Sequence, residues 1–318
     1  MTTHKITWLL YHEPIDLFLR TAKAFSERIA ERTSNRISVE IYTTKEYAEK
    51  FTNGIEFDPV SLLVNGHIQM SQIYINELAK EGVSDFCALD MPFLFRDHDH
   101  CARVLEGEIG QFLFDKMQLK VDAKGLAFTY SGGYRVMATE KNITNSADFV
   151  GLEIAVQKNT VFMDTFEAFG CSVTPVDRRA PRESELAIKQ TSKNLQTTLP
   201  RYKNEADPAV HKYVVNTEHN MYLTSILIGT DFWQQLSDED KLAIQETANE
   251  CARLERKWTL EDAEKIATDA AEQAKLGIKS YKNLSAEDSD KLRQASKPLY
   301  DKYRDVFSPG LLDKILLS

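Results

Sequence analysis

The 318-residue sequence lacks the short motifs that identify several enzyme classes. It has no Gly-x-Gly-x-x-Gly, P-loop, His-Glu-x-x-His, Gly-x-Ser-x-Gly or EF-hand loop. The only histidine cluster, His98-Asp99-His100, lies in a polar run without an evident third ligand. We expect a solvated loop there, with a metal site as the alternative. The sequence therefore predicts a protein that is not an enzyme and holds neither a metal nor a cofactor.

Long apolar runs and basic runs are also missing. The longest apolar stretches, such as residues 221–229, are far shorter than the ~20 residues that a membrane-spanning helix requires. No signal peptide precedes the strand-like residues 6–11, which predicts either a cytoplasmic protein or one that begins at its mature end. The net charge of −9, with no Lys/Arg-rich run, argues against a nucleic-acid partner.

Cysteine is scarce, and the four residues are far apart. No Cys-x-x-Cys pair exists, which makes a zinc site or a thioredoxin-like motif a poor interpretation. Scattered cysteines are most often small buried side chains, so we expect thiols, with one disulfide as the alternative. They weakly favour a reducing compartment. The four are Cys87, Cys101, Cys171 and Cys251.

The first part of the chain shows alternating strand and helix patterns. Residues 16–32 place Phe18, Ala22, Phe25 and Ile29 on one helical face. Strand-like residues 6–11 and 36–42 flank this helix, and a second round follows as a helix at 58–64 and a strand at 68–74. Such alternation predicts a mostly parallel sheet with helices on both faces. The length indicates about two domains.

The last third of the chain contains long helical patterns. Residues 211–216 and 222–228 are predicted strands that return the chain to the first lobe. A near capping box at 237–240 then starts a long helical pattern that runs to about residue 275. A similar start signal at 284–288 predicts a further helix to residue 304. Because no linker separates the lobes, the chain should cross between them more than once.

Residues 125–156 carry the most informative pattern. They predict a strand, a corner at Gly132 and Gly133, a second strand, a short helical turn and a third strand. Arg135 comes just after the glycine corner. A fixed cation between strands is well placed to hold an anion, because an arginine fork matches a carboxylate. A structural arginine at this corner is the alternative.

Several segments together resemble the substrate-binding subunits of TRAP (tripartite ATP-independent periplasmic) transporters, the DctP-like family. Residues 89–95 (LDMPFLF) are similar to the family's Leu-Pro-Phe-Leu-Phe turn. Residues 146–154 resemble its Asp-Leu-Lys-Gly-Leu-Lys-Ile segment, and 232–237 resemble the Trp-x-x-Leu-Pro entry to its long helix. Residues 21–42 resemble the family's opening helix and second strand.

The resemblance implies an α/β, two-lobed periplasmic-binding-protein fold of type II-like architecture. Strands would cross between the lobes, and a long C-terminal helix would span both of them around an enclosed ligand. We expect lobe I at residues 1–130 plus about 221–250, and lobe II at 131–220. The long helix would occupy 237–276, and C-terminal helices at 277–318 would pack across the lobes.

In this family two arginines meet the substrate carboxylate. Arg135 matches the first, but Ala155 stands at the second position, in the sequence GLEIAV. The stretch 187–197 and Gly229 also depart from the family pattern. Compared with the family pattern, the chain is a few residues longer between Pro175 and Glu183. An arginine in this stretch could replace the missing one. The other predicted ligand contacts are Tyr134, His12, Glu13, Tyr74, Gln157, Asn194, Arg178 and Tyr222; Arg179 and Arg182 are further candidates for the replacement.

Two functional interpretations follow from the resemblance. The first is an extracytoplasmic solute-binding protein that delivers a small organic ligand, most simply an organic acid, to TRAP membrane subunits. The second is a non-transport binding or sensor protein whose remodelled cleft takes a neutral ligand or a protein partner. The first implies a periplasmic location, and a cytoplasmic location is the alternative. We expect a monomer or a homodimer.

Overall fold

The computed structural model describes residues 3–11, 16–55, 57–176 and 192–318. It divides into two compact units. Unit 1 is built from Met1–Val83, Ala102–Tyr130 and Leu223–Trp258, and unit 2 from Ser84–Cys101, Ser131–Tyr222 and Thr259–Ser318. Residues 84–101 were expected in the first lobe, whereas Ser84–Cys101 belongs to unit 2.

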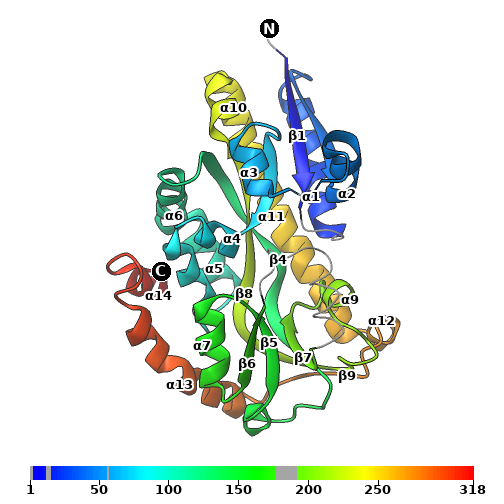
Figure 1. Cartoon of the computed structure of the whole chain (residues 1–318), viewed down its shortest axis with the longest axis vertical. Helices are drawn as coiled ribbons and strands as arrows, with labels where there is room; N and C mark the ends of the chain where they lie inside the picture. Colours follow the sequence, from blue (N-terminus) through cyan, green and yellow to red (C-terminus); the bar gives the residue numbers. More distant parts are fainter. Residues whose placement is uncertain (1–2, 12–15, 56, 177–191) are drawn as a thin grey trace. The chain divides into compact units, whose positions relative to one another are not determined.

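Each unit combines strands with helices (Figure 1). The elements of unit 1 are β1 (His4–Leu10), α1 (Asp16–Arg32), β2 (Ile37–Thr43), α2 (Thr44–Tyr47), the π-helical turn η1 (Ala48–Thr52), α3 (Pro59–Val64), β3 (Met70–Tyr74), α4 (Ile75–Lys80), α6 (Glu108–Gln118) and α10 (Thr230–Gln235). Those of unit 2 are η2 (Ser84–Asp90), η3 (Ser146–Phe149), β5 (Glu153–Gln157), α7 (Thr160–Ala168), β6 (Ser172–Val176), β7 (Asn194–Thr197), α9 (Tyr202–Glu205), α12 (Ala270–Lys275), β9 (Ser280–Asn283), α13 (Ala286–Tyr303) and α14 (Leu311–Leu317). The elements with residues in both units are α5 (His98–Glu106), β4 (Ala123–Thr139), β8 (Tyr213–Gly229) and α11 (Asp238–Thr268).

In unit 1 the strands lie in the order β2-β1-β3-β8. β1 pairs with β2 and β3 in parallel, and β3 pairs with β8 in antiparallel orientation. Helix α1 buries its apolar stripe as predicted, and its Phe25 ring lies 5.2 Å from the Trp8 ring of β1. The parallel strands and the crossover helix follow from the periodicity of the sequence.

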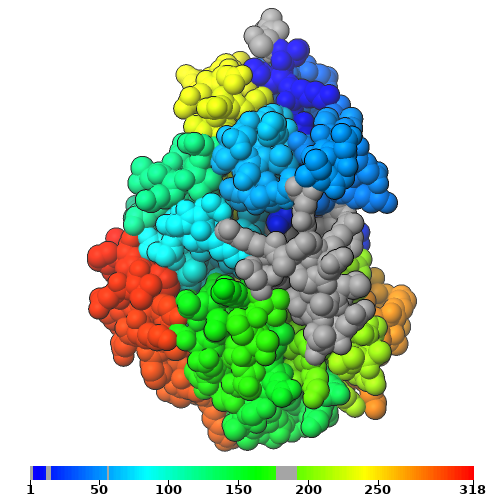
Figure 2. All heavy atoms as spheres, viewed as in Figure 1, coloured from blue at the N-terminus to red at the C-terminus, as the bar shows by residue number. Residues whose placement is uncertain are grey.

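In unit 2 the strands lie in the order β4-β7-β5-β6, and β9 pairs with β8. The core includes Phe149, Phe162 and Phe166, all essentially inaccessible to solvent. Helix α7 contacts β5 and β6, and α13 contacts α7 (Figure 1). Figure 2 shows the C-terminal residues, coloured orange to red, beside the green α7 region on the surface of unit 2.

Three long elements differ from the sequence prediction. β4 and β8 are continuous 17-residue strands, where a corner or gap was expected in each. Glycines at positive φ let β4 continue through the predicted corner, because glycine has no Cβ to clash there. The long C-terminal helix ends at Thr268, where Asp269 caps the separate helix α12. Among the described residues, no helix combines the length and apolar character needed to cross a bilayer.

Candidate functional site

Arg135 lies in the core of unit 2, on β4. It is buried, with 2% of its surface exposed. Its guanidinium carbon lies 3.6 Å from the centre of the Tyr222 ring and 4.9 Å from that of the Phe162 ring. Aromatic faces attract a cation, so the two rings stabilise the charge and fix the plane of the guanidinium. Arg135 and Tyr222, both predicted ligand contacts, are thus brought together.

Two glycines allow the strand that carries Arg135 to pass close to its neighbours. Gly132 and Gly133 have φ values of +98° and +82°, a conformation that side chains rarely adopt. A Cβ on Gly132 would lie 1.9 Å from the hydroxyl oxygen of Thr198. That hydroxyl donates a hydrogen bond of 3.1 Å to the carbonyl of Ser131. The glycine is therefore required by a close approach, which positions β4 just before Arg135.

A buried carboxyl group belongs to the same region. Asp90, at the end of η2, is 2% exposed and accepts a 2.8 Å hydrogen bond from the Asn159 side chain. Burial raises the pKa of Asp90 to about 7, although the charge of Arg135 and the Asn159 hydrogen bond both oppose the shift. The Asp90 carboxyl group therefore loses its proton near neutral pH. Its charge interacts with that of Arg135.

A buried histidine is a second titratable group near Arg135. His219 donates from Nε2 to the Gln196 side-chain oxygen at 3.0 Å, and its Nδ1 accepts from the Thr217 hydroxyl at 2.7 Å. Burial and, to a smaller extent, the Arg135 charge lower the pKa of His219 to about 3. The imidazole is consequently neutral at physiological pH. It contributes hydrogen bonds near Arg135 and does not add a second positive charge.

Sequence reasoning missed a second buried arginine, Arg201. Its guanidinium carbon lies 5.0 Å from the Tyr222 ring centre, and Nη1 donates to the Ser131 hydroxyl at 2.9 Å. Two further hydrogen bonds, of 3.0 and 2.7 Å, join Arg201 to Glu205. The i,i+4 spacing of Arg201 and Glu205 was a sequence signal for the ion pair, but not for its position beside Tyr222.

Ala155, which stands where the family has its second arginine, is partly exposed. Ala155, on β5, lies opposite Thr174 of β6 and Leu195 of β7. Leu195 is buried, whereas Thr174 is exposed. The expected replacements Arg178, Arg179 and Arg182 lie outside the described residues, as do the predicted contacts His12 and Glu13.

The other predicted contacts of unit 2 lie on β4, β5 and β7. Tyr134 precedes Arg135 on β4, and successive strand residues point to opposite faces. Its hydroxyl donates to the Phe95 carbonyl at 3.2 Å, and burial raises its pKa. Asn194, at the start of β7, donates to the Glu153 carbonyl at 2.8 Å, which is a bond between strands. Gln157 is buried at the end of β5.

Tyr74 is the one described candidate in unit 1. It ends β3 and is buried, with its ring 6.4 Å from that of Phe18. The carboxyl end of a strand in an α/β sheet is a common place for ligand contacts, which is why Tyr74 was predicted. The contact with Phe18 makes Tyr74 part of the apolar packing of unit 1.

The histidine cluster is not the solvated loop that we expected. His98 begins helix α5, which Asp97 caps by accepting a 2.6 Å hydrogen bond from the His100 N–H. His100 is buried; its Nδ1 accepts from the Arg96 N–H at 3.1 Å and its Nε2 donates to the Ile315 carbonyl at 2.8 Å. Throughout the described residues, no group of three His, Cys, Asp or Glu side chains is arranged to hold a metal ion.

The cysteines form no disulfide in the part of the chain that the structure describes. Cys101, Cys171 and Cys251 are buried, as expected for small core side chains, and Cys87 is partly exposed. Burial raises the pKa of Cys171 and of Cys251 to about 12. Both thiols are therefore protonated and unreactive at neutral pH.

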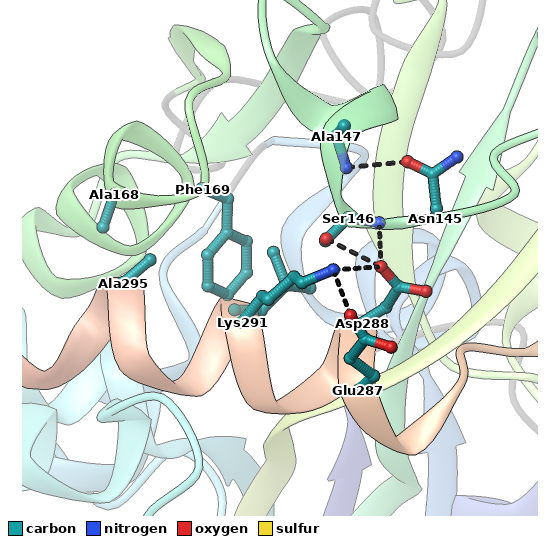
Figure 3. Close-up of a pocket in the computed structure, with 10 residues that line it drawn as sticks. Asn145, Ser146, Ala147, Ala168, Phe169, Glu287, Asp288, Lys291 and Ala295 are labelled. Carbon is teal, nitrogen blue, oxygen red and sulfur yellow. Dashed lines mark hydrogen bonds and ion pairs between the residues drawn. The ribbon is translucent and has the colours of Figure 1, made fainter.

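A shallow groove of about 480 Å³ lies on unit 2 between η3, the end of α7 and α13 (Figure 3). Phe169 and Leu292 form its apolar part. Its charged side chains already interact with one another: Lys291 forms ion pairs with Glu287 and Asp288. Asp288 also accepts a 2.8 Å hydrogen bond from the Ser146 hydroxyl. The groove is thus a junction between a helix and a turn in which one cation faces two carboxylates.

The chain belongs to a known family of binding proteins. Residues 11–305 match the DctP model, bacterial extracellular solute-binding protein family 7. The C4-dicarboxylate-binding periplasmic protein DctP of Rhodobacter capsulatus is 23% identical over 88% of this chain and 80% of its own length. The sialic acid-binding periplasmic protein SiaP of Vibrio cholerae is 25% identical over 72% of this chain and 68% of its own.

Solved structures confirm the fold class. A TRAP periplasmic solute-binding protein from Polaromonas, bound to D-erythronate, has a TM-score of 0.82 and 24% identity, with 98% of each chain covered. One from Pseudomonas putida, with bound D-glucuronate, has a TM-score of 0.79 and 22% identity, covering 98% of this chain and 96% of the other. The predicted two-lobed α/β fold of TRAP solute-binding proteins is therefore correct, as is the family resemblance.

Proposed function

We propose that this protein is the periplasmic solute-binding subunit of a TRAP-type transporter and that Arg135 binds the carboxylate of a small organic acid. The observation that carries the proposal is the buried guanidinium of Arg135 against the Tyr222 ring. The N–H groups of a guanidinium point outward in its plane. A ring that covers its face therefore does not block them, and a carboxylate can still bind edge-on through two hydrogen bonds.

Family membership supports the class of ligand. The relatives include C4-dicarboxylate and sialic acid binders, and related solved structures contain D-erythronate and D-glucuronate. All of these ligands are carboxylic acids. Delivery to membrane subunits, periplasmic location and closure of the two units on the ligand belong to the same proposal. Scattering curves recorded with and without ligand would test the closure.

The experiment is a thermal-shift screen with a panel of sugar acids, dicarboxylates and hydroxy acids, followed by calorimetry on the hits. A ligand that binds the native state raises the melting temperature. Arg135→Gln should abolish the shift. The matched control is Arg293→Gln, because Arg293 also lies over a ring, Phe93 at 4.7 Å, but its side chain is half exposed. An acid that binds the Arg135→Gln variant as tightly as wild type would refute the anchor role.

A neutral ligand is the second candidate function. It is favoured by Ala155, which removes one cation of the family pair, and by Asp90, whose carboxylate form supplies a negative charge near Arg135. The same screen extended to sugars, polyols and amides distinguishes the two. Hits confined to uncharged compounds, and unaffected by Arg135→Gln, would support a non-transport binding or sensor protein.

A further inference from the structure

A network of polar side chains lies in the core of unit 1. Its centre is Glu255 of α11, which is completely buried. Gln72 of β3 donates to the two oxygens of Glu255 at 2.8 and 2.9 Å. The amide nitrogen of Gln72 is also 2.8 Å from the Thr129 hydroxyl of β4 and 3.1 Å from the Thr224 hydroxyl of β8. These two hydroxyls are 2.5 Å apart.

The contacts of Thr21 indicate which protonation state the network requires. The Thr21 hydroxyl is 2.5 Å from Glu255 Oε2 and 3.0 Å from the Leu17 carbonyl. A hydroxyl has one proton, so it cannot donate to both a carboxylate and a carbonyl. If Glu255 is protonated, it donates to Thr21, and Thr21 donates to Leu17. Both contacts of Thr21 are then hydrogen bonds, which the ionised form cannot achieve.

Burial of Glu255 favours the same state, although the positive charge of Arg20 opposes it. The side chains that hydrogen-bond to it, Thr21, Gln72 and Thr129, are all neutral. The other titratable groups are Arg20 of α1, which lies over the Trp258 ring, and two neighbours on α11. Of these two, Arg256 bonds to the Phe128 carbonyl and Glu106, and Cys251 carries a protonated thiol. Burial accordingly raises the pKa of Glu255 to about 8.

The network joins the segments that continue from unit 1 into unit 2. β4 changes unit after Tyr130, β8 before Leu223 and α11 after Trp258. Thr129, Thr224 and Glu255 lie close to these three boundaries, on the unit 1 side. Gln72 and Thr21 belong to β3 and α1, which lie wholly within unit 1. The network therefore attaches three connecting segments to one unit at the places where they leave it.

We propose that a single proton on Glu255 fastens β4, β8 and α11 to the core of unit 1, and that loss of this proton loosens all three connecting segments together. The device is a proton-dependent clamp on the connections between the units. It does not depend on the identity of the ligand. An ionised Glu255 would be a buried charge whose hydrogen-bond partners are all neutral. Hydrating that charge requires the local structure to open.

Hydrogen exchange on the full chain tests the clamp. Exchange rates are first corrected for the intrinsic rates of the amides. Wild-type amides near residues 126–130, 223–227 and 252–257 should then lose protection between about pH 6 and about pH 9. The loss should be on the order of tenfold per pH unit until Glu255 is fully ionised. Glu255→Gln keeps a neutral hydrogen-bonding group and should abolish this dependence. The control is Glu246→Gln, an exposed position on the same helix, which should behave as wild type.

Two results would overturn the proposal. One is an equal loss of protection in wild type and Glu255→Gln, and the other is a loss spread evenly over unit 1. If Glu255→Gln does not fold, carbon-13 NMR of wild-type protein labelled at the glutamate carboxyl decides the matter. One resonance should titrate near pH 8, far above the others. Ionisation of every glutamate below about pH 5.5 would refute the proposal.

Discussion

The guanidinium carbon of Arg135 lies 3.6 Å from the centre of the Tyr222 ring, and that of Arg201 lies 5.0 Å from the same centre. One aromatic ring thus contacts two buried cations. Arg201 is paired with Glu205, whereas Arg135 lies within electrostatic reach of Asp90 and His219. The two arginines consequently have different roles: Arg201 stabilises the fold of unit 2, and Arg135 is the proposed ligand anchor.

Replacing the Tyr222 ring should weaken organic-acid binding. In Tyr222→Leu the guanidinium of Arg135 loses its closest aromatic face, which is worth about 1–2 kcal/mol for a desolvated cation. We expect affinity to fall about tenfold, whereas Tyr222→Phe retains the ring and should bind almost as wild type. Titration calorimetry with a ligand from the screen measures both. Equal losses in the two variants would assign the effect to the hydroxyl instead.

Breaking the Arg201–Glu205 pair should destabilise unit 2. The side chains are 7% and 12% exposed, so Glu205→Gln leaves a buried guanidinium without its counter-charge. We expect a loss of about 3 kcal/mol in the free energy of unfolding, measured by urea denaturation. The double variant Arg201→Gln/Glu205→Gln removes both charges and should recover part of the loss. Simple additivity of the two single losses would contradict a coupled pair.

His219 should make the protein less stable as the solution is acidified. Because its folded-state pKa is lowered from 6.5 to about 3, the unfolded chain binds a proton in this window that the folded chain does not. Stability contributed by His219 is complete above about pH 6.5 and falls towards pH 3 by about 1.4 kcal/mol per pH unit.

The His219 prediction is checked with His219→Gln, which should flatten the dependence of the denaturation midpoint on pH between about 6.5 and 4. The control is His67→Gln, since His67 is exposed and should leave the slope of wild type unchanged. Parallel slopes for wild type and His219→Gln would show that His219 does not carry the acid sensitivity.

Gly132→Ala should destabilise the protein far more than Gly151→Ala. Both glycines have positive φ, so each substitution adds backbone strain of about 1 kcal/mol. Only at Gly132 does the new Cβ meet other atoms, those of Thr198, whereas nothing lies within 4 Å at Gly151. We expect an additional cost of about 1–3 kcal/mol, read as a lower melting temperature. Similar melting temperatures for the two variants would argue against the close approach.

Local regularities of the sequence predicted much of the fold. Helix α1 has the predicted ends because one apolar stripe and its flanking strands define it. The corner at Gly132 was predicted as a break, since glycine usually interrupts a strand, but β4 continues through it. Gly132 closely approaches Thr198, which is distant in sequence, and no local pattern contains that information.

The candidate site was only partly predictable for the same reason. Arg135 and Tyr222 were identified through the resemblance and the strand pattern. Arg201 was not, because its position depends on a bond to Ser131 across 70 residues of chain. Asp90 lies within the recognised LDMPFLF turn, yet its unusual titration arises from burial and not from its sequence neighbours. A sequence motif does not show how far the tertiary fold removes a side chain from water, so it cannot predict such a pKa shift.

The discontinuous make-up of unit 1 limits the order in which the protein can fold during its synthesis. The last stretch of unit 1, Leu223–Trp258, is translated after the whole of Ser131–Tyr222. The unit 1 parts of β8 and α11 are therefore complete in the nascent chain only once residue 258 has left the ribosome. Early intermediates would expose the surface of β3 that β8 later pairs with. Truncation anywhere before residue 258 should thus leave unit 1 incomplete and dependent on chaperones.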